Sequence, residues 1–257
     1  MSAILDQRRR AFDDPDVVKA YAYRAPYPAA LFVRLQELSP RPGRLLDLGC
    51  GPGKLALPLA ASLQHVDAVD PAEAMIAAAS ALGATSNIRW IVADAEAAPL
   101  AGEYDLVTAG ASIHWMRPDV LFPRLRPHLA PGAVFAVVAG DEPNDPPWRD
   151  HWSGFVRRWV ERMGGAYDRP AFDAESNAYR SWLDIGGDEF ISSTVRQTIA
   201  DFIQAEHSRG TWTRRRMGPD RAAAFDAELA ELLAPHASEG WLTFQVRTHL
   251  TYGRPIA

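Results

Sequence analysis

The sequence predicts an α/β fold in which a mostly parallel sheet carries the functional site. Five short apolar segments between residues 44 and 139 alternate with segments that suit helices, and this alternation is typical of a parallel sheet with right-handed crossovers. Three glycines at alternate positions, Gly49, Gly51 and Gly53, separate the first of these strands from the first helix. Two further strands are expected later in the chain, which makes seven.

Each expected element in the first part of the chain has a local reason. The acid-rich segment from Asp13 to Asp16 begins a helix because aspartate caps helix N-termini, and Pro28 begins a second helix that ends at Leu38. Pro71 suits the first turn of a later helix. The strands are expected over residues 44–48, 65–70, 88–93, 104–108 and 133–139, with helices over 53–63, 71–79 and 118–129 between them.

The pattern changes after Gly140. A turn-rich segment is followed by aromatic side chains three or four residues apart, which places them on one helical face. We interpret residues 141–188 as an inserted helical cap, closed by Trp182 and the pair Gly186-Gly187. A strand over 190–199, a helix over 222–236 and a strand over 241–252 then follow. The predicted organisation is one domain with N-terminal helices at 1–43, a ligand-binding core at 44–140, the cap at 141–188 and completion of the sheet at 189–257.

Composition narrows the class of protein. The chain has 257 residues, a formal net charge of -5 and one cysteine, Cys50. A negative net charge disfavours a nucleic-acid partner, and no apolar run approaches the ~18 residues that span a bilayer. The arginines at positions 8–10 precede no apolar core, so they do not form a signal peptide. We expect a cytoplasmic protein, either a monomer or a homodimer, that binds neither nucleic acid nor membrane.

The glycine turn can be compared with known ligand-binding turns. A phosphate-binding P-loop needs a hydroxyl after its lysine, whereas Lys54 is followed by Leu55. A dinucleotide fingerprint places its third glycine one residue later, and Asp47 would repel a pyrophosphate. An acid before the glycines suits a cationic group, such as the ammonium of an amino acid.

The segment Leu46-Asp47-Leu48-Gly49-Cys50-Gly51-Pro52-Gly53 resembles the first motif of the class I S-adenosylmethionine-dependent methyltransferases. In that family the glycine turn lies under the methionine part of the cofactor. Asp70 ends the second strand, where an acid can accept both ribose hydroxyls, although a dinucleotide-binding protein would also have it. Pro71 and Met75 match the family pattern after this acid, which implies that Met75 packs on the adenine; a core position in its helix is the alternative.

The third strand is followed by Asp94 and Ala95. By the same resemblance, Asp94 accepts the adenine amino group and the Ala95 amide contacts the ring; a helix cap is the alternative for Asp94. The resemblance implies a Rossmann-like, seven-stranded, mostly parallel sheet with one antiparallel strand, helices on both faces and the inserted cap. It also implies S-adenosylmethionine as cofactor, S-adenosylhomocysteine as product and no metal.

The segment after the fourth strand, residues 108–116, resembles the small-molecule type 11 branch, which includes trans-aconitate methyltransferase-like enzymes. It contains Gly110, expected at the cofactor, and the pair His114-Trp115. An imidazole titrates near neutral pH, so His114 is a candidate general base; packing against Trp115 is the alternative. The Asp/Asn-Pro-Pro-aromatic segment of amide methyltransferases is absent, which argues against methylation of DNA adenine or protein glutamine.

Two aromatic segments complete the expected site. Tyr23-Arg24-Ala25-Pro26-Tyr27-Pro28 resembles the N-terminal segment of the same branch, with Ala25 displacing a proline by one place. The resemblance implies that Tyr23 or Tyr27 covers the cofactor and that Arg24 holds its carboxylate; an ordered linker is the alternative. The cap suits the roof of an acceptor pocket or, equally, a core of its own or a dimer surface. The expected pocket residues are Tyr27, Trp115, Trp148, Trp152 and Trp159.

The expected function is methyl transfer to a small-molecule acceptor, at a hydroxyl or carboxylate oxygen. Such a transfer is an in-line displacement in which the protein aligns the two reactants and excludes water. Methylation at carbon or nitrogen is one alternative. A non-catalytic cofactor-binding or interaction protein and a nicotinamide-dependent oxidoreductase are the others, although the glycine spacing and the absence of a Tyr-x-x-x-Lys pair disfavour the last.

Overall fold

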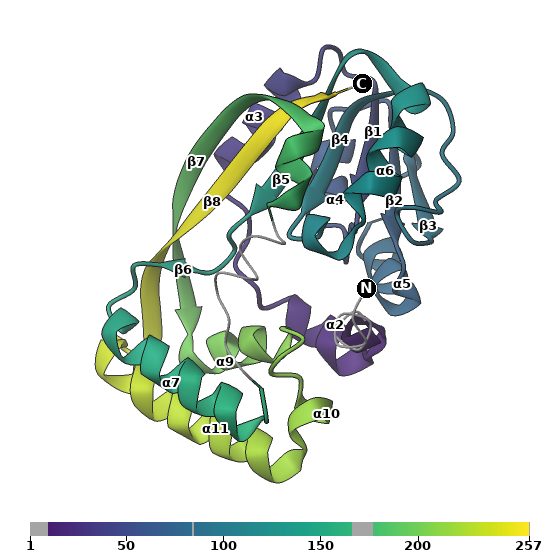
Figure 1. The fold of residues 1–257 in the computed structure, drawn as a ribbon. Coiled ribbons are helices and arrows are strands. Elements are labelled where there is room, and N and C mark those ends of the chain that lie inside the picture. The colour runs from purple at the N-terminus through teal and green to yellow at the C-terminus, as the bar shows by residue number, and fades with distance from the viewer. Residues whose placement is uncertain (1–9, 84, 166–176, 257) are drawn as a thin grey trace. The chain divides into compact units, whose positions relative to one another are not determined.

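The computed structural model describes residues 10–83, 85–165 and 177–256 (Figure 1). Residues 1–9 of the expected N-terminal segment and residues 166–176 of the expected cap lie outside the described residues. The chain forms two compact units. We call them the sheet unit, within residues 26–140, 173–191 and 248–257, and the helical unit, within residues 1–25, 141–172 and 192–247.

Five parallel strands form the centre of the sheet unit, in the order β3-β2-β1-β4-β5. The first two strands are bounded as the sequence predicts, because each leads through apolar residues to a glycine turn or an acid. All but the first residue of each is buried, as expected for a parallel sheet covered on both faces. The strands are β1 (Arg44–Leu48), β2 (His65–Asp70), β3 (Ile88–Val92), β4 (Tyr104–Gly110) and β5 (Leu129–Ala139).

Two long strands extend this sheet and have residues in both units. β8 (Trp241–Pro255) runs antiparallel to β5, pairing Phe135 with Gly253 and Ala139 with His249. β7 (Leu183–Thr198) pairs with β8. Its direction follows from contacts of Asp184 near Gly253 and of Thr194 with Gln245, so β7 is antiparallel to β8 and parallel to β5.

The expected mostly parallel, Rossmann-like sheet with one antiparallel strand is therefore confirmed. Among the described residues the sheet has eight strands rather than seven. The additional strand is the two-residue β6 (Pro143–Asn144), which pairs with β8 inside the helical unit. Its shortness explains why no periodicity in the sequence indicates it.

Helices cover both faces of the sheet unit (Figure 1). Alternate β1 residues point to opposite faces, so Leu45 packs with α3 and α4 residues, whereas Leu46 packs with α6 residues. The helices of this unit are α3 (Ala29–Leu38), α4 (Ala56–Ala60), α5 (Glu73–Leu82) and α6 (Pro118–Leu125), with short 3-10 turns η2 (Ile113–Trp115), η3 (Arg126–His128) and η4 (Ala178–Trp182).

The helical unit has a separate aromatic core. Trp148, Phe155 and Phe225 pack there with apolar residues of the β8 segment, including Phe244. Asp14 caps the first of its helices by accepting from the amide of Asp16, as the acid-rich start predicts. The helices are α2 (Pro15–Tyr21), α7 (Arg149–Arg162), α9 (Ile199–His207), α10 (Arg214–Met217) and α11 (Pro219–Leu233), with 3-10 turns η1 (Arg10–Asp13) and η5 (Ala234–His236).

Several expected boundaries differ from the structure, and three of them concern the glycine turn, the helix after β2 and the expected cap. The helix expected over 53–63 is only α4, because residues 51–55 form successive turns after the glycines. Pro71 precedes α5 instead of lying in its first turn. The pair Gly186-Gly187 does not close a cap but lies within β7, where a Cβ at Gly187 would be 2.6 Å from the Tyr252 ring. Glycine there makes room for a neighbouring side chain.

Two glycine substitutions should have opposite effects on stability. A Cβ at Gly253 would lie 2.4 Å from the backbone carbonyl oxygen of Asp184, so Gly253→Ala should lower the free energy of unfolding by about 1–3 kcal/mol. Gly154 lies inside α7, where a Cβ would meet only the end of Arg158 at 3.7 Å. Gly154→Ala should therefore raise stability by about 0.5–1 kcal/mol. Urea denaturation measures both, and equal effects would contradict the strand pairing.

Candidate active site

The candidate site lies in the sheet unit, at the carboxyl ends of β1, β2 and β4. The turn after β1 contains three glycines with positive φ, namely 66° at Gly49, 53° at Gly51 and 82° at Gly53. At Gly49 a Cβ would be only 2.4 Å from the Cβ of Ser112. The absence of a side chain there lets the turn lie directly against the segment that follows β4.

Asp47 lies at the base of this turn and is almost completely buried. Its Oδ1 accepts a hydrogen bond of 2.7 Å from the Thr108 hydroxyl, whereas its Oδ2 has no hydrogen-bond partner among the described residues. Burial raises the pKa of Asp47 to about 7, the Thr108 hydroxyl and the Ala56 amide oppose this rise, and the charge of Asp70 adds to it. A buried carboxylate oxygen without a donor suits a cationic donor from a ligand.

Asp70 joins the glycine turn to the end of β2. Its Oδ2 accepts from the Gly51 amide at 2.9 Å, and its Oδ1 accepts from the Ala72 amide at 2.9 Å. These bonds fix the orientation of the carboxylate, and a carboxylate oxygen can accept more than one hydrogen bond. The expected ribose-binding role needs such a fixed pair of oxygens.

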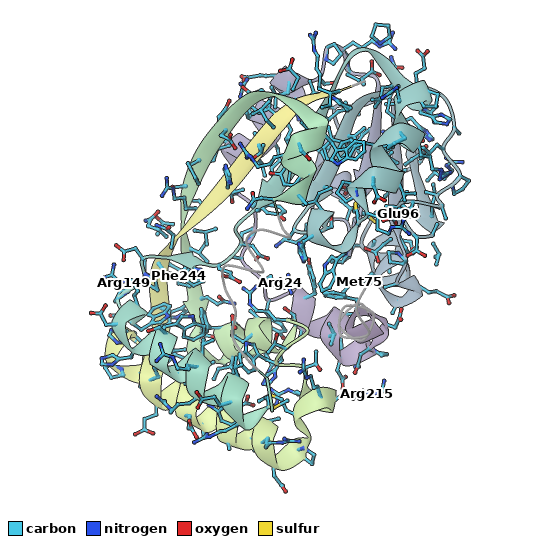
Figure 2. The ribbon with its side chains drawn as sticks, viewed as in Figure 1. Arg24, Met75, Glu96, Arg149, Arg215 and Phe244 are labelled. Atoms are coloured by element: carbon cyan, nitrogen blue, oxygen red, sulfur yellow. The ribbon has the colours of Figure 1, made fainter. Side chains whose placement is uncertain are left out.

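The remaining expected cofactor residues also lie in the sheet unit. The Ala93 amide donates to the Asp70 carbonyl at 3.1 Å, so the segment with Asp94 and Ala95 begins beside the end of β2. Asp94 is exposed, and Ala95 is buried in the core on the α6 side. Met75, labelled in Figure 2, is only 1% exposed within α5, and Pro71 is exposed just before that helix.

Gly110 ends β4 and brings Tyr27 to this edge of the sheet. A Cβ at Gly110 would be 2.8 Å from Leu55 Cδ1 and 3.3 Å from the Tyr27 hydroxyl. The Tyr27 ring lies under Lys54, whose Nζ is 4.7 Å from the ring centroid. Lys54 is not among the site residues expected from the sequence, although its position directly after Gly53 could have indicated it.

His114 and Trp115 form η2 just after β4. Their ring centroids are 4.6 Å apart and their planes are inclined by 46°, so the packing that the sequence allowed as an alternative is present. Ser112, which precedes them, donates to the Leu48 carbonyl at 2.6 Å. Ser112 and Thr108 thus hold the β1 end in place. The sequence does not predict this role, because both residues lie in β4 or the loop after it, about 60 residues along the chain from β1.

Five expected site residues belong to the helical unit instead. Arg24, labelled in Figure 2, donates to the Ser208 hydroxyl at 2.7 Å and the Ser208 carbonyl at 3.0 Å. Its Nη1 is 3.6 Å from an Asp141 carboxylate oxygen. Tyr23 is 42% exposed, and its carbonyl accepts from Gln197. These contacts all lie within the helical unit.

The cap tryptophans are mainly core residues of the helical unit. Trp148 and Trp159 are each 1% exposed and pack among the aromatic rings of that core. Trp159 also donates to a Glu228 carboxylate oxygen at 3.1 Å. Trp152 is half-buried and stacks on Phe155, with centroids 5.6 Å apart. A core role is the alternative to a pocket roof that the sequence leaves open, and the burial of Trp148 and Trp159 corresponds to that alternative.

The chain is similar in sequence and in fold to known methyltransferases. A family profile described as a methyltransferase domain matches residues 45–132. A solved structure from Anaeromyxobacter dehalogenans, assigned to the type II methyltransferases, aligns with a TM-score of 0.69 at 28% identity, covering 90% of this chain and 97% of that one. These similarities support a class I S-adenosylmethionine-dependent methyltransferase. A structure from Bacillus halodurans, with a TM-score of 0.52 at 17% identity, shares the fold.

Several proteins with similar sequences are named trans-aconitate 2-methyltransferase. The one from Variovorax paradoxus is 38% identical over 133 residues, which cover 49% of this chain and 50% of the relative. The one from Streptomyces avermitilis is 29% identical over 241 residues, covering 87% of this chain and 88% of the relative. The chain thus spans about half the length of the first of these relatives.

The donor set fits the cofactor of this family. The unpartnered Asp47 oxygen suits an ammonium, and the fixed Asp70 carboxylate suits a pair of hydroxyls. Within residues 10–83, 85–165 and 177–256, no group of three His, Cys, Asp or Glu side chains could hold a metal ion. In the same ranges, no helix is both long enough and apolar enough to span a membrane.

The Asp47 carboxyl should make cofactor binding depend on pH. The ionised form binds an ammonium much more strongly because only that form carries the opposite charge. With a pKa of about 7, the carboxyl is mostly protonated at pH 6 and mostly ionised at pH 8. The affinity for S-adenosylhomocysteine, measured by calorimetry, should therefore rise about five- to tenfold from pH 6 to pH 8. Asp47→Asn should bind more weakly at both values, with no such rise.

The same carboxyl should make the folded protein less stable as the pH rises, whereas it makes cofactor binding tighter. Its pKa in the folded protein is above the ordinary value, so the folded state holds a proton that the unfolded state releases. Stability is therefore lost as pH rises from about 4 through 7, by at most ~4 kcal/mol. Without cofactor, Asp47→Asn should gain stability relative to the wild type between pH 5 and pH 8. A constant difference would show that Asp47 is ionised throughout.

Proposed function

We propose that this protein transfers the methyl group of S-adenosylmethionine to an oxygen of a small-molecule acceptor. The observation that carries the proposal is the pair of acids at the β1 and β2 ends. Asp47 has a buried oxygen without a donor, and Asp70 has both oxygens oriented by the backbone of the glycine turn. This combination suits one ligand with an ammonium at one end and a ribose nearby.

The proposed division of roles follows the sheet edge. Asp47 accepts the ammonium, Asp70 accepts the two ribose hydroxyls, and the segment with Asp94 and Ala95 holds the adenine together with Met75. When bound, the cofactor supplies an electrophilic methyl group on a sulfonium. The protein's contribution is to hold the acceptor in line with that methyl group and to exclude water.

His114 is the proposed base for a hydroxyl acceptor. It follows β4 at the same edge of the sheet, and an imidazole can take a hydroxyl proton near neutral pH. A carboxylate acceptor would need no base. The names of the similar relatives make trans-aconitate the first acceptor to test. The lone thiol, Cys50, is buried in the turn, and the cytoplasm stays the proposed location.

Cofactor binding is the first test of this proposal. S-Adenosylhomocysteine should raise the melting temperature, whereas NADH should not. Asp70→Asn should weaken S-adenosylhomocysteine binding by about 10- to 100-fold, because charge-assisted hydrogen bonds to the ribose become neutral ones. Stabilisation by NADH alone would favour an oxidoreductase. Binding without methylation of any component of a metabolite extract would favour a non-catalytic binding protein.

The role of His114 is tested by turnover. With a hydroxyl acceptor, His114→Ala should lower kcat by about 100-fold or more, since general-base catalysis typically contributes this much. The dissociation constant for S-adenosylhomocysteine should change less than about twofold, because the ring is assigned no cofactor contact. A kcat equal to that of the wild type would reduce His114 to a packing partner of Trp115.

A further inference from the structure

The proposed cofactor carries a carboxylate as well as an ammonium on its methionine part. Asp47 accounts for the ammonium, so the carboxylate needs a cation or other donor nearby. The sequence resemblance implies Arg24 for this role. However, the Arg24 side chain is only 8% exposed, and its guanidinium donates to Ser208 and lies beside Asp141 within the helical unit. A bound carboxylate would have to compete with these contacts.

Lys54 is the cation that the glycine turn itself provides. It directly follows Gly53, and its Nζ lies 4.7 Å from the centroid of the Tyr27 ring. Tyr27 is buried, and its hydroxyl reaches the position where Gly110 ends β4. The Lys54 ammonium, the Tyr27 ring and the end of β4 therefore lie next to one another in the sheet unit, at the glycine turn after β1.

We propose that Lys54 binds the carboxylate of the cofactor's methionine part, with the Tyr27 ring as a platform under its ammonium. This inference rests on the proposed function and assigns a specificity role within the same site. A lysine side chain has a long, flexible stem, and contact of its ammonium with an aromatic face restricts that stem to one region. An ammonium has three donors, so it can stay over the ring while donating to a carboxylate.

Asp47 and Lys54 then give the turn opposite charges at its two ends. Asp47 precedes the first glycine, and Lys54 follows the last. The ammonium and carboxylate of an amino acid are attached to one carbon, and a short turn with an acid at one end and a base at the other matches that dipole. The predicted consequence is selectivity for adenosine ligands that carry an intact amino acid.

The test compares two ligands that differ in this part. S-Adenosylhomocysteine carries the amino acid, whereas 5′-methylthioadenosine has the same adenosine without it. Calorimetry should show that Lys54→Gln weakens S-adenosylhomocysteine binding about 10- to 100-fold, with 5′-methylthioadenosine binding unchanged. Lys54→Arg should restore most of the affinity. Asp70→Asn should weaken both ligands by similar factors, because both contain the ribose.

Arg117→Gln is the matched control for loss of one positive charge. Arg117 lies in the sheet unit, and its half-exposed side chain pairs with Asp119 at 3.5 Å. This variant should bind both ligands like the wild type. Equal losses for both ligands in Lys54→Gln, or no loss, would overturn the Lys54 assignment. A selective loss in Arg24→Lys, with Lys54→Gln unaffected, would assign the carboxylate to Arg24. Failure of the wild type to bind either ligand would instead refute the proposed function.

Discussion

The hydrogen bonds from Gly51 and Ala72 to Asp70 are the constraint on which the candidate site depends. They join the turn after β1 to the segment after β2, so two parallel strand ends act as one rigid edge. The turn can take this path because Gly49 has no side chain to collide with Ser112. Without the carboxylate, two backbone donors would lose their partner and the turn would lose its only charged anchor to β2 among the described residues.

Asp47, at the same edge of the sheet, shows a conflict between the stability of the folded protein and the proposed binding of the cofactor. Burial of this carboxylate costs the folded protein free energy when it ionises, despite the Thr108 hydroxyl, and a neutral residue of the same shape would avoid that cost. The charge is useful only when a cation arrives. The strand residues around it are fully buried, which keeps water away from the carboxylate and makes its attraction for an ammonium stronger than it would be at the surface.

The sequence predicts the sheet unit well and the helical unit poorly, for a physical reason. β1 and β2 are short strands with clear ends in the sequence. Asp47, Asp70 and the glycines lie at those ends, so the local pattern determines both the strands and the site. In the helical unit, periodicity correctly places Trp148 and Trp159 on a buried face but cannot say what covers that face; α11 and β8 residues do. The contacts of Arg24 depend on Ser208, which is 184 residues away, and no local motif encodes them.

The two long strands β7 and β8 limit where the chain can be cut to produce shorter folded fragments. The chain passes from one unit to the other five times, and both long strands cross a unit boundary. No continuous fragment therefore contains a whole unit, and the edge of β5 is paired only when residues 249–253 are in place. Neither unit can be produced alone by simple truncation. A circular permutant or a split protein would have to keep β7 and β8 intact, because cutting either strand removes structure from both units at once.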